Sequence, residues 1–163
     1  MNAMMIDGRA IAQVVRGRWK KRVAALKTRG VTPGLAVIMI GNNPASRVYV
    51  RNKVKACAEV GLYSETHEFP ADIGEEAVIW RIQELNQNPT IHGILVQLPL
   101  PVHIDAERVM QLVAPEKDID GLTWPNLVAL LAGRALYEPC MPSGIVVLLE
   151  RVGIGIDGRH ALC

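Results

Sequence analysis

The chain has 163 residues and a formal net charge of +2, and half of it is hydrophobic, although only one Phe, three Trp and three Tyr are present. This length supports one domain with a substantial aliphatic core. The charges are scattered, which argues against a nucleic-acid partner and favours small-molecule or protein partners. No apolar run approaches the length that spans a bilayer, so no membrane partner is expected.

The cysteines favour a reducing compartment. Cys57, Cys140 and Cys163 are an odd number and lack the spacing of metal ligands, so neither a disulfide framework nor a metal site is expected. Residues 1–7 lack the basic and apolar regions of a secretory signal. These features together predict a cytoplasmic protein.

The first half of the chain predicts a helix, a strand, a helix and a strand. Apolar residues at three- and four-residue spacings indicate a helix that starts after Asp7 and ends at Gly30. The continuous apolar run 35–40 indicates a strand buried on both faces, as in a parallel sheet flanked by helices. A helix over 45–59, capped by Gly61, and a more exposed strand over 63–69 follow.

The second half repeats this alternation. The predicted elements are a helix over 75–86, a strand over 93–97, a short helix over 105–113, a helical turn over 126–132 and a helix over 144–152 capped by Ser143. Residues 158–163 are typical of the entry to another strand, which suggests a fragment of a longer chain. The alternation predicts an α/β fold of three layers with a largely parallel sheet flanked by helices.

Tyr49 and Lys53 are four residues apart in a predicted helix, so both lie on one face, about one turn apart. If that face lines a cleft, an aromatic ring and an ionisable amine meet the same ligand. Burial lowers the pKa of a lysine, and a neutral amine can accept or relay a proton. A half-buried ring beside a solvated amine on an ordinary surface helix is the alternative. A short-chain dehydrogenase is excluded, because no G-x-G-x-x-G precedes Tyr49.

Gln97 and Asp120 are two further candidates. Gln97 ends a buried strand at the carboxyl edge of the expected sheet, where ligands bind in open α/β folds. Its amide suits either a lysine amine or ligand amide, or simply neighbouring backbone groups. Asp120 lies in the polar loop 115–121 and suits a carboxylate that accepts two N–H groups of a fused heterocycle, with a solvated acidic turn as the alternative. This loop lacks the later glycine and glutamate of a calcium-binding EF-hand.

Five segments taken in order form a specific set: Pro33-Gly34-Leu35-Ala36-Val37, Gly41-x-x-Pro44-Ala45-Ser46, Tyr49-x-x-x-Lys53, Gly93-Ile94-Leu95-Val96-Gln97-Leu98-Pro99-Leu100-Pro101 and Pro115-Glu116-Lys117-Asp118-Ile119-Asp120-Gly121. This set resembles the bifunctional methylenetetrahydrofolate dehydrogenase/methenyltetrahydrofolate cyclohydrolase family, from about Ile6 to the end of the chain. The stretch from Trp80 to Pro99 is similar to that family's first signature.

The resemblance implies a folate-binding catalytic domain over 1–155, with 156–163 as the start of an NADP-binding Rossmann domain. It implies NADP-dependent oxidation of 5,10-methylenetetrahydrofolate, then hydrolysis of 5,10-methenyltetrahydrofolate to 10-formyltetrahydrofolate, in one-carbon metabolism and purine biosynthesis. NADP would bind outside this chain, so cofactor-binding residues are not assigned and the chain alone is not expected to act as a dehydrogenase. A homodimer is expected, as is an exposed apolar patch where the absent parts would pack.

By the same resemblance, Tyr49 stacks against the aminobenzoyl ring, Lys53 is the central acid/base group and Gln97 orients Lys53. Asp120 anchors the pterin. The remaining expected substrate contacts are Ser46, Leu98, Pro99 and Gly121.

The chain departs from the family pattern at two places. Met141 stands where threonine is common, and Val128-Ala129 stands where glycine-arginine is common. These departures leave three alternatives open: a folate-binding pseudoenzyme, a monofunctional dehydrogenase of the same family, and a structural α/β module.

Overall fold

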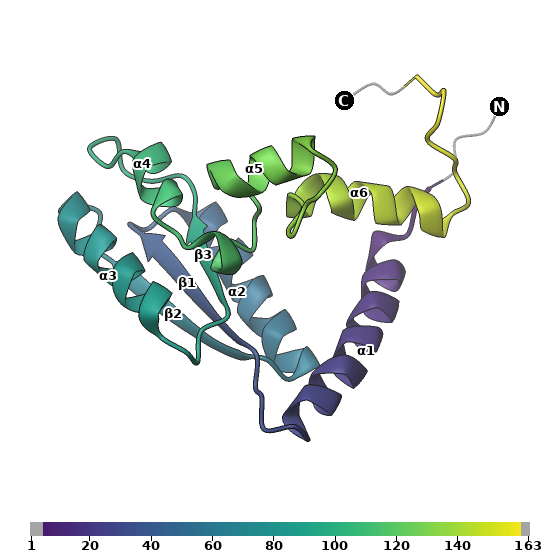
Figure 1. Cartoon of the computed structure of the whole chain (residues 1–163), viewed down its shortest axis with the longest axis horizontal. Coiled ribbons are helices and arrows are strands. Elements are labelled where there is room, and N and C mark those ends of the chain that lie inside the picture. The colour runs from purple at the N-terminus through teal and green to yellow at the C-terminus, as the bar shows by residue number, and fades with distance from the viewer. Residues whose placement is uncertain (1–4, 161–163) are drawn as a thin grey trace.

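A computed structural model of the chain describes residues 5–160 (Figure 1). The fold is α/β, as predicted. Its elements are α1 (Gly8–Lys27), β1 (Gly34–Ile40), α2 (Pro44–Val60), β2 (Tyr63–Phe69), α3 (Glu75–Gln87), β3 (Gly93–Gln97), α4 (Ala106–Gln111), the 3₁₀ turn η1 (Pro115–Lys117), α5 (Trp124–Leu131) and α6 (Cys140–Arg151).

The sheet is parallel and has the strand order β2-β1-β3. The central strand β1 is almost wholly buried, as its apolar run predicts. Its two faces pack against different helices, because side chains alternate along a strand. Ile38 joins the core formed with α3 and α4, while Val37 and Met39 pack with Val50 of α2. The sheet therefore lies between two helical layers, as Figure 1 shows.

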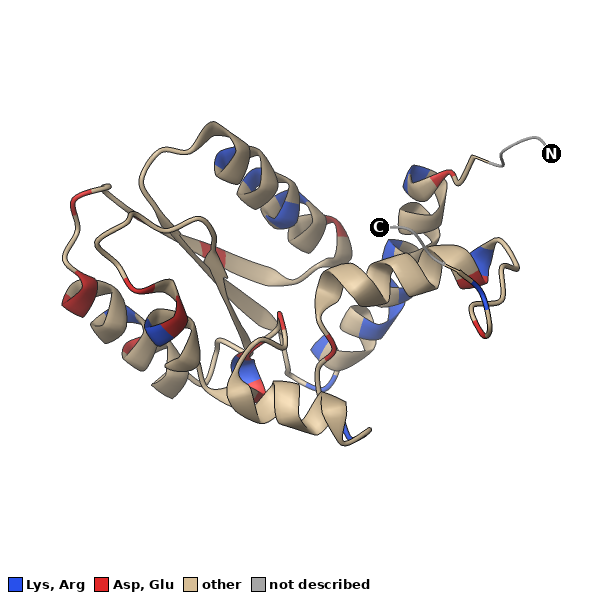
Figure 2. Cartoon of the chain, turned by 90° about the horizontal axis from the view of Figure 1, so that it is seen from above, with Lys and Arg blue, Asp and Glu red and all other residues tan. Residues whose placement is uncertain are grey.

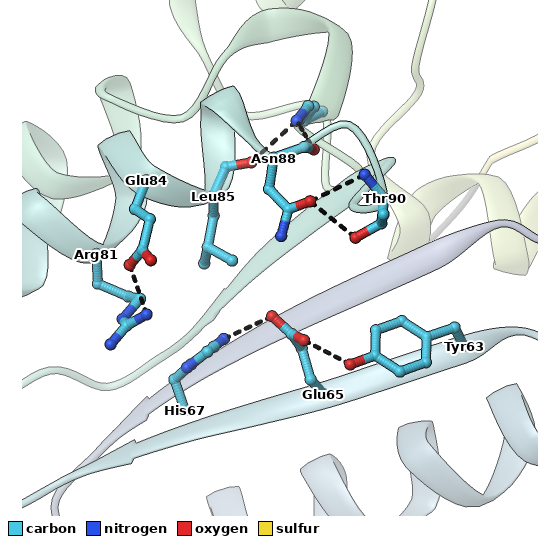
Figure 3. Close-up of polar contacts among 9 residues, drawn as sticks. Tyr63, Glu65, His67, Arg81, Glu84, Leu85, Asn88 and Thr90 are labelled. Carbon is cyan, nitrogen blue, oxygen red and sulfur yellow. Dashed lines mark hydrogen bonds and ion pairs between the residues drawn. The ribbon is translucent and has the colours of Figure 1, made fainter.

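The edge strand β2 is more exposed than β1, as its alternating sequence predicts. Its polar side chains bond to one another on the face that α3 covers (Figure 3). Tyr63 Oη donates to Glu65 Oε2 at 2.7 Å, and His67 Nε2 lies 2.9 Å from Glu65 Oε1. These hydrogen bonds satisfy the polar side chains of β2, which α3 covers only in part.

The limits of α2 follow from its end residues. Asn43 Oδ1 accepts hydrogen bonds from Ala45 N at 2.9 Å and Ser46 N at 3.1 Å, and thus caps the helix N-terminus. Gly61 closes the other end in the left-handed conformation, with φ 88°, which confirms the predicted cap. By contrast, α1 ends at Lys27 and not at the predicted Gly30. Gly30 has a positive φ, but it lies in the turn that follows the helix.

Two helices begin earlier than predicted. α6 starts at Cys140 rather than at 144, and the Ser143 hydroxyl donates to Glu138 instead of capping a helix. Proline fits the first turn of a helix, where its missing N–H has no intrahelical partner, so Pro142 does not delay the start. α5 likewise starts at Trp124.

Residues 158–160 form no strand, and 161–163 lie outside the described residues. The expected strand there, and a domain boundary at 155, stay predictions. Within 5–160 no helix has both the length and the apolarity needed to cross a bilayer.

Candidate active site

The segments that follow β1 and β3 meet beside the N-terminus of α2. Ser46, in the first turn of α2, is buried, and its Oγ donates to the carbonyl O of Leu98 at 3.2 Å. This bond joins the start of the helix after β1 to the residue that follows β3. The predicted meeting of chain segments at the carboxyl edge of the sheet is therefore present, and it is where α/β folds place their ligands.

Gln97 ends β3 at this edge. Leu95, two residues earlier, packs against α2, so Gln97 lies on the same face of the strand, towards the helix that carries Lys53. Gln97 Nε2 donates to Leu98 O at 2.8 Å, and no hydrogen bond joins Gln97 to Lys53 among residues 5–160. Gln97 Oε1 is buried and has no partner there either, so it is an acceptor available to a ligand or an amine.

Lys53 and Asp120 approach one another from α2 and from the loop after β3. Both are half-buried. Burial raises the pKa of the Asp120 carboxyl and the charge of Asp118 raises it further, while the charge of Lys53 opposes both effects. The Asp120 carboxyl therefore lies where the charge of Lys53 acts on it.

Cys140 reaches the same loop from the start of α6. Its Sγ donates to the carbonyl O of Ile119 at 3.1 Å. Burial raises the pKa of the Cys140 thiol, and the charge of Asp120 adds to that rise. The thiol therefore stays protonated at neutral pH and acts as a hydrogen-bond donor.

The other predicted residues line the edge in different ways. Tyr49 is 63% exposed, and Leu98 is 40% exposed, so both are accessible to a ligand. The Leu98–Pro99 peptide bond is cis. Gly121 is buried with φ 66°, and a Cβ there would lie 3.0 Å from the Tyr137 carbonyl O, so this position requires glycine.

Residues 6–120 match the model of the family described as tetrahydrofolate dehydrogenase/cyclohydrolase, catalytic domain. The chain belongs to this family. It is 54% identical over 162 residues to the bifunctional protein FolD of Nitrosospira multiformis, an alignment that covers 99% of this chain and 56% of that protein.

Solved structures of the family share the fold. The Trypanosoma brucei methylenetetrahydrofolate dehydrogenase-cyclohydrolase (FolD), complexed with NADP cofactor and inhibitor, superposes with a TM-score of 0.93 at 38% identity, over 98% of this chain and 55% of its own. The bifunctional enzyme FolD of Campylobacter jejuni gives 0.90 at 36% identity, over 93% and 54%. The chain thus spans about half the length of the tetrahydrofolate dehydrogenase/cyclohydrolase relatives it matches.

A nucleotide site of this family does not fit the residues of this chain. The loop after β1, residues 41–43, has a single glycine and continues into Pro44 at the first position of α2. A dinucleotide site needs several glycines there, so that backbone N–H groups approach the pyrophosphate. The loop after β1 therefore lacks the glycine pattern of a dinucleotide site.

Sequence reasoning missed three residues that shape this site in the tetrahydrofolate dehydrogenase/cyclohydrolase fold. Asp118 and Asn126 are buried and bonded to one another beneath the loop of Asp120, and Cys140 bonds to that loop from α6. Asp118 belongs to the motif of residues 115–121, and this position in a motif was the only indication of its role. Neither Asn126 nor Cys140 had a periodicity or spacing that would have revealed its contact.

Proposed function

We propose that this chain supplies the folate site of a bifunctional enzyme of one-carbon metabolism. The enzyme oxidises 5,10-methylenetetrahydrofolate to 5,10-methenyltetrahydrofolate with NADP, and then hydrolyses the product to 10-formyltetrahydrofolate. The observation that carries the proposal is the convergence of Lys53, Asp120 and the unpaired acceptor Gln97 Oε1 at the carboxyl edge of the sheet.

The residue chemistry fits the two steps. NADP, bound by polypeptide outside this chain, supplies the hydride acceptor. Asp120 accepts hydrogen bonds from N–H groups of the pterin, and the exposed ring of Tyr49 offers a flat surface to the aminobenzoyl group. Ser46, through its bond to Leu98, fixes the backbone on which Leu98 and Pro99 flank the substrate.

Lys53 carries the proton transfers of hydrolysis. As water adds to the methenyl carbon, the neutral Lys53 amine takes one proton from the water and later returns it to the ring nitrogen whose C–N bond breaks; the remaining hydroxyl proton is released to solvent as the formyl carbonyl forms. Gln97 Oε1 accepts a hydrogen bond from the Lys53 amine and so orients it, while Gln97 Nε2 stays on Leu98 O. Gly121 lets the loop turn tightly beneath the pterin.

The first experiment follows the decay of methenyltetrahydrofolate absorbance with the chain and with its Lys53→Ala variant. General acid/base catalysis is worth on the order of 100-fold or more, so we expect acceleration that the variant loses. Lys55→Ala, which removes an exposed lysine from the same helix, is the matched control and should keep full activity. Equal turnover by Lys53→Ala and wild type in the full-length enzyme would refute this role for Lys53.

The wider context is part of the same proposal. Family membership supports a cytoplasmic enzyme that feeds purine biosynthesis and acts as a homodimer. Sedimentation velocity of the purified protein tests the oligomeric state, and a monomer at micromolar concentration would contradict it.

A folate-binding pseudoenzyme is the second candidate. It is favoured by Met141, which replaces a common threonine directly after Cys140, the residue that bonds to the loop of Asp120. Folate binding without hydrolysis in the full-length protein would support it. Hydride transfer without hydrolysis would instead indicate a monofunctional dehydrogenase.

A further inference from the structure

Asp118 is a carboxylate enclosed by the fold. Asp118 is 5% exposed, and its partner Asn126 is 3% exposed. Asp118 Oδ2 accepts hydrogen bonds from Thr123 N at 2.7 Å and from Asn126 Nδ2 at 2.9 Å. Burying an ionised group is costly unless such donors satisfy it. A buried carboxylate with these partners therefore indicates a specific role in the structure.

We propose that Asp118 is a positioning residue of the folate site, which holds the turn bearing Asp120 and Gly121 by bonding it to the N-terminus of α5. This role rests on the proposed function, because it concerns the same site. Asp118 itself does not face the substrate.

The first support is the geometry of the turn. Gly121 N donates to Asp118 O at 3.2 Å, so residues 118–121 close on themselves with Asp120 inside the turn. Asp118 also forms an isolated parallel bridge with Ile94 of β3. The hydrogen bonds of the carboxylate therefore fix a residue that joins this turn to the edge strand β3.

The second support is the close contact that the residues on both sides of Asp118 make with the rest of the fold. A Cβ on Gly93 would overlap Cγ2 of Ile119, so Ile119 packs directly on the backbone of β3. Asn126 Nδ2 also donates to Pro115 O at 2.9 Å, which joins the start of the loop to the same amide. Displacing Asp118 would shift Ile119, and Asp120 with it.

The third support is charge. Burial raises the pKa of the Asp118 carboxyl, but the hydrogen bonds from Asn126 and Thr123 lower it by more, so Asp118 is ionised at neutral pH. The groups that act on Asp120 are Lys53 from α2, Cys140 from α6 and Asp118 from its own loop. Burial is the main cause of the raised pKa of Asp120, and the negative charge of Asp118 adds to it, so Asp118 both holds Asp120 in place and makes it harder to ionise.

The test measures the affinity of the chain for 5-formyltetrahydrofolate by calorimetry across pH, for wild type, Asp118→Asn and Asn126→Ala. In Asp118→Asn the amide oxygen can still accept the two hydrogen bonds that reach Oδ2, but these bonds lose the charge that strengthens them, so we expect affinity to fall about tenfold at neutral pH. Asn126→Ala removes one donor and keeps the charge of Asp118, so a smaller loss, about threefold, is expected. Asp72→Asn, at an exposed position, is the control for lost charge.

The pH profile separates this role from a merely structural one. Protonated Asp120 cannot accept two N–H groups, so wild-type affinity falls on acidification. Without the charge of Asp118 the pKa of Asp120 drops, and the fall moves to lower pH in Asp118→Asn but not in Asn126→Ala. An unmoved profile with wild-type affinity overturns the inference.

Two further outcomes are decisive. If Asp118→Asn does not fold, as far-UV circular dichroism would show, unchanged affinity of Asn126→Ala overturns the inference and a weakened one supports it. If wild type itself fails to bind the folate, the proposed function fails and this role falls with it, a result distinct from loss in the variants alone.

Discussion

The pKa values of two carboxylates two residues apart are shifted in opposite directions, although burial raises both. Asp118 is enclosed among donors that lower its pKa in spite of burial, whereas burial dominates for Asp120 and raises its pKa. The difference lies in the hydrogen bonds that each receives from the backbone and from Asn126, since both carboxylates belong to one short loop. Such a pair separates a structural charge from a group that is free to meet a ligand.

This contrast predicts opposite pH effects on stability, measured as the free energy of unfolding in urea. Asp118 has a lowered folded pKa, so its stabilisation is present above the unfolded pKa, about 3.9, and is lost as pH falls through the folded pKa. Asp118→Asn should therefore cost about 1–3 kcal/mol at neutral pH and less on acidification.

Asp120 has a raised folded pKa, so its favourable contribution is present below the unfolded pKa and is lost as pH rises through the folded pKa. Asp120→Asn should therefore be as stable as wild type in acid and more stable at neutral pH, while its folate binding weakens. Asp72→Asn controls for the general loss of charge. Parallel pH slopes for the Asp118 and Asp120 variants would contradict the assignment.

At the scale of elements, the loop of the site is fastened to the end of α3. Lys117 Nζ donates to Leu85 O at 2.9 Å and to Asn88 O at 2.8 Å, which satisfies carbonyls that a helix C-terminus leaves unpaired. Asn86 adds a second tie, through Nδ2 to Leu112 O at 2.8 Å. Figure 3 shows Leu85 and Asn88 at this end of the helix.

We expect Lys117→Met to cost about 1–2 kcal/mol of unfolding free energy, because two carbonyls lose a charged donor. The apolar stem keeps its packing, so the change isolates the hydrogen bonds. Lys20→Met, on an exposed position of α1, is the matched control and should stay within about 0.5 kcal/mol of wild type. Equal denaturation midpoints for the two variants would show that the tie contributes nothing.

The sequence predicted those elements whose packing is periodic. The strands 63–69 and 93–97 and the cap Gly61 match the structure, because alternation, apolar runs and glycine each have one strong conformational meaning. The start of α6 at Cys140 was not predicted. Proline usually interrupts a helix, so the sequence places the helix after Pro142, although the first turn of a helix tolerates proline.

The site was predicted in part for a similar reason. Motifs predict Lys53 and Asp120 as site residues, and the structure places the two near one another; the rotamer of Gln97, which places its Nε2 on Leu98 O, depends on tertiary contacts that no motif indicates. The bond from Asn126 to Asp118 lies within an irregular loop, where no periodic pattern indicates which side chains turn inward.

At the scale of the whole molecule, one region is poor in charge and rich in exposed apolar groups. α6 has no buried residue, Leu131 at the end of α5 is 89% exposed, and Met141 is 79% exposed. Figure 2 shows few charged residues on these two helices, in contrast to α1. The exposed apolar groups agree with the expected patch, and patches of this kind bind apolar partners or dyes.

We expect the chain to enhance the fluorescence of a hydrophobic dye while it remains folded. Leu131→Gln combined with Met141→Thr should lower that emission by about half with an unchanged melting temperature, since neither side chain is buried. Val102→Gln, exposed on a loop elsewhere, serves as control. Emission that persists unchanged in the double variant would place the apolar surface elsewhere.

The bond from Ser46 Oγ to Leu98 O joins residues 52 positions apart, whereas Asp118 and Thr123 are separated by only 5. Closing a long loop costs more chain entropy than closing a short one, and it slows the search for the native contact. During folding the turn of Asp118 can therefore form early, while Ser46 and Leu98, on two sides of the proposed folate site, come together only once β3 has docked on β1. A chain that had not yet completed that step would have its helices and one pair of strands, but the proposed site would be unformed.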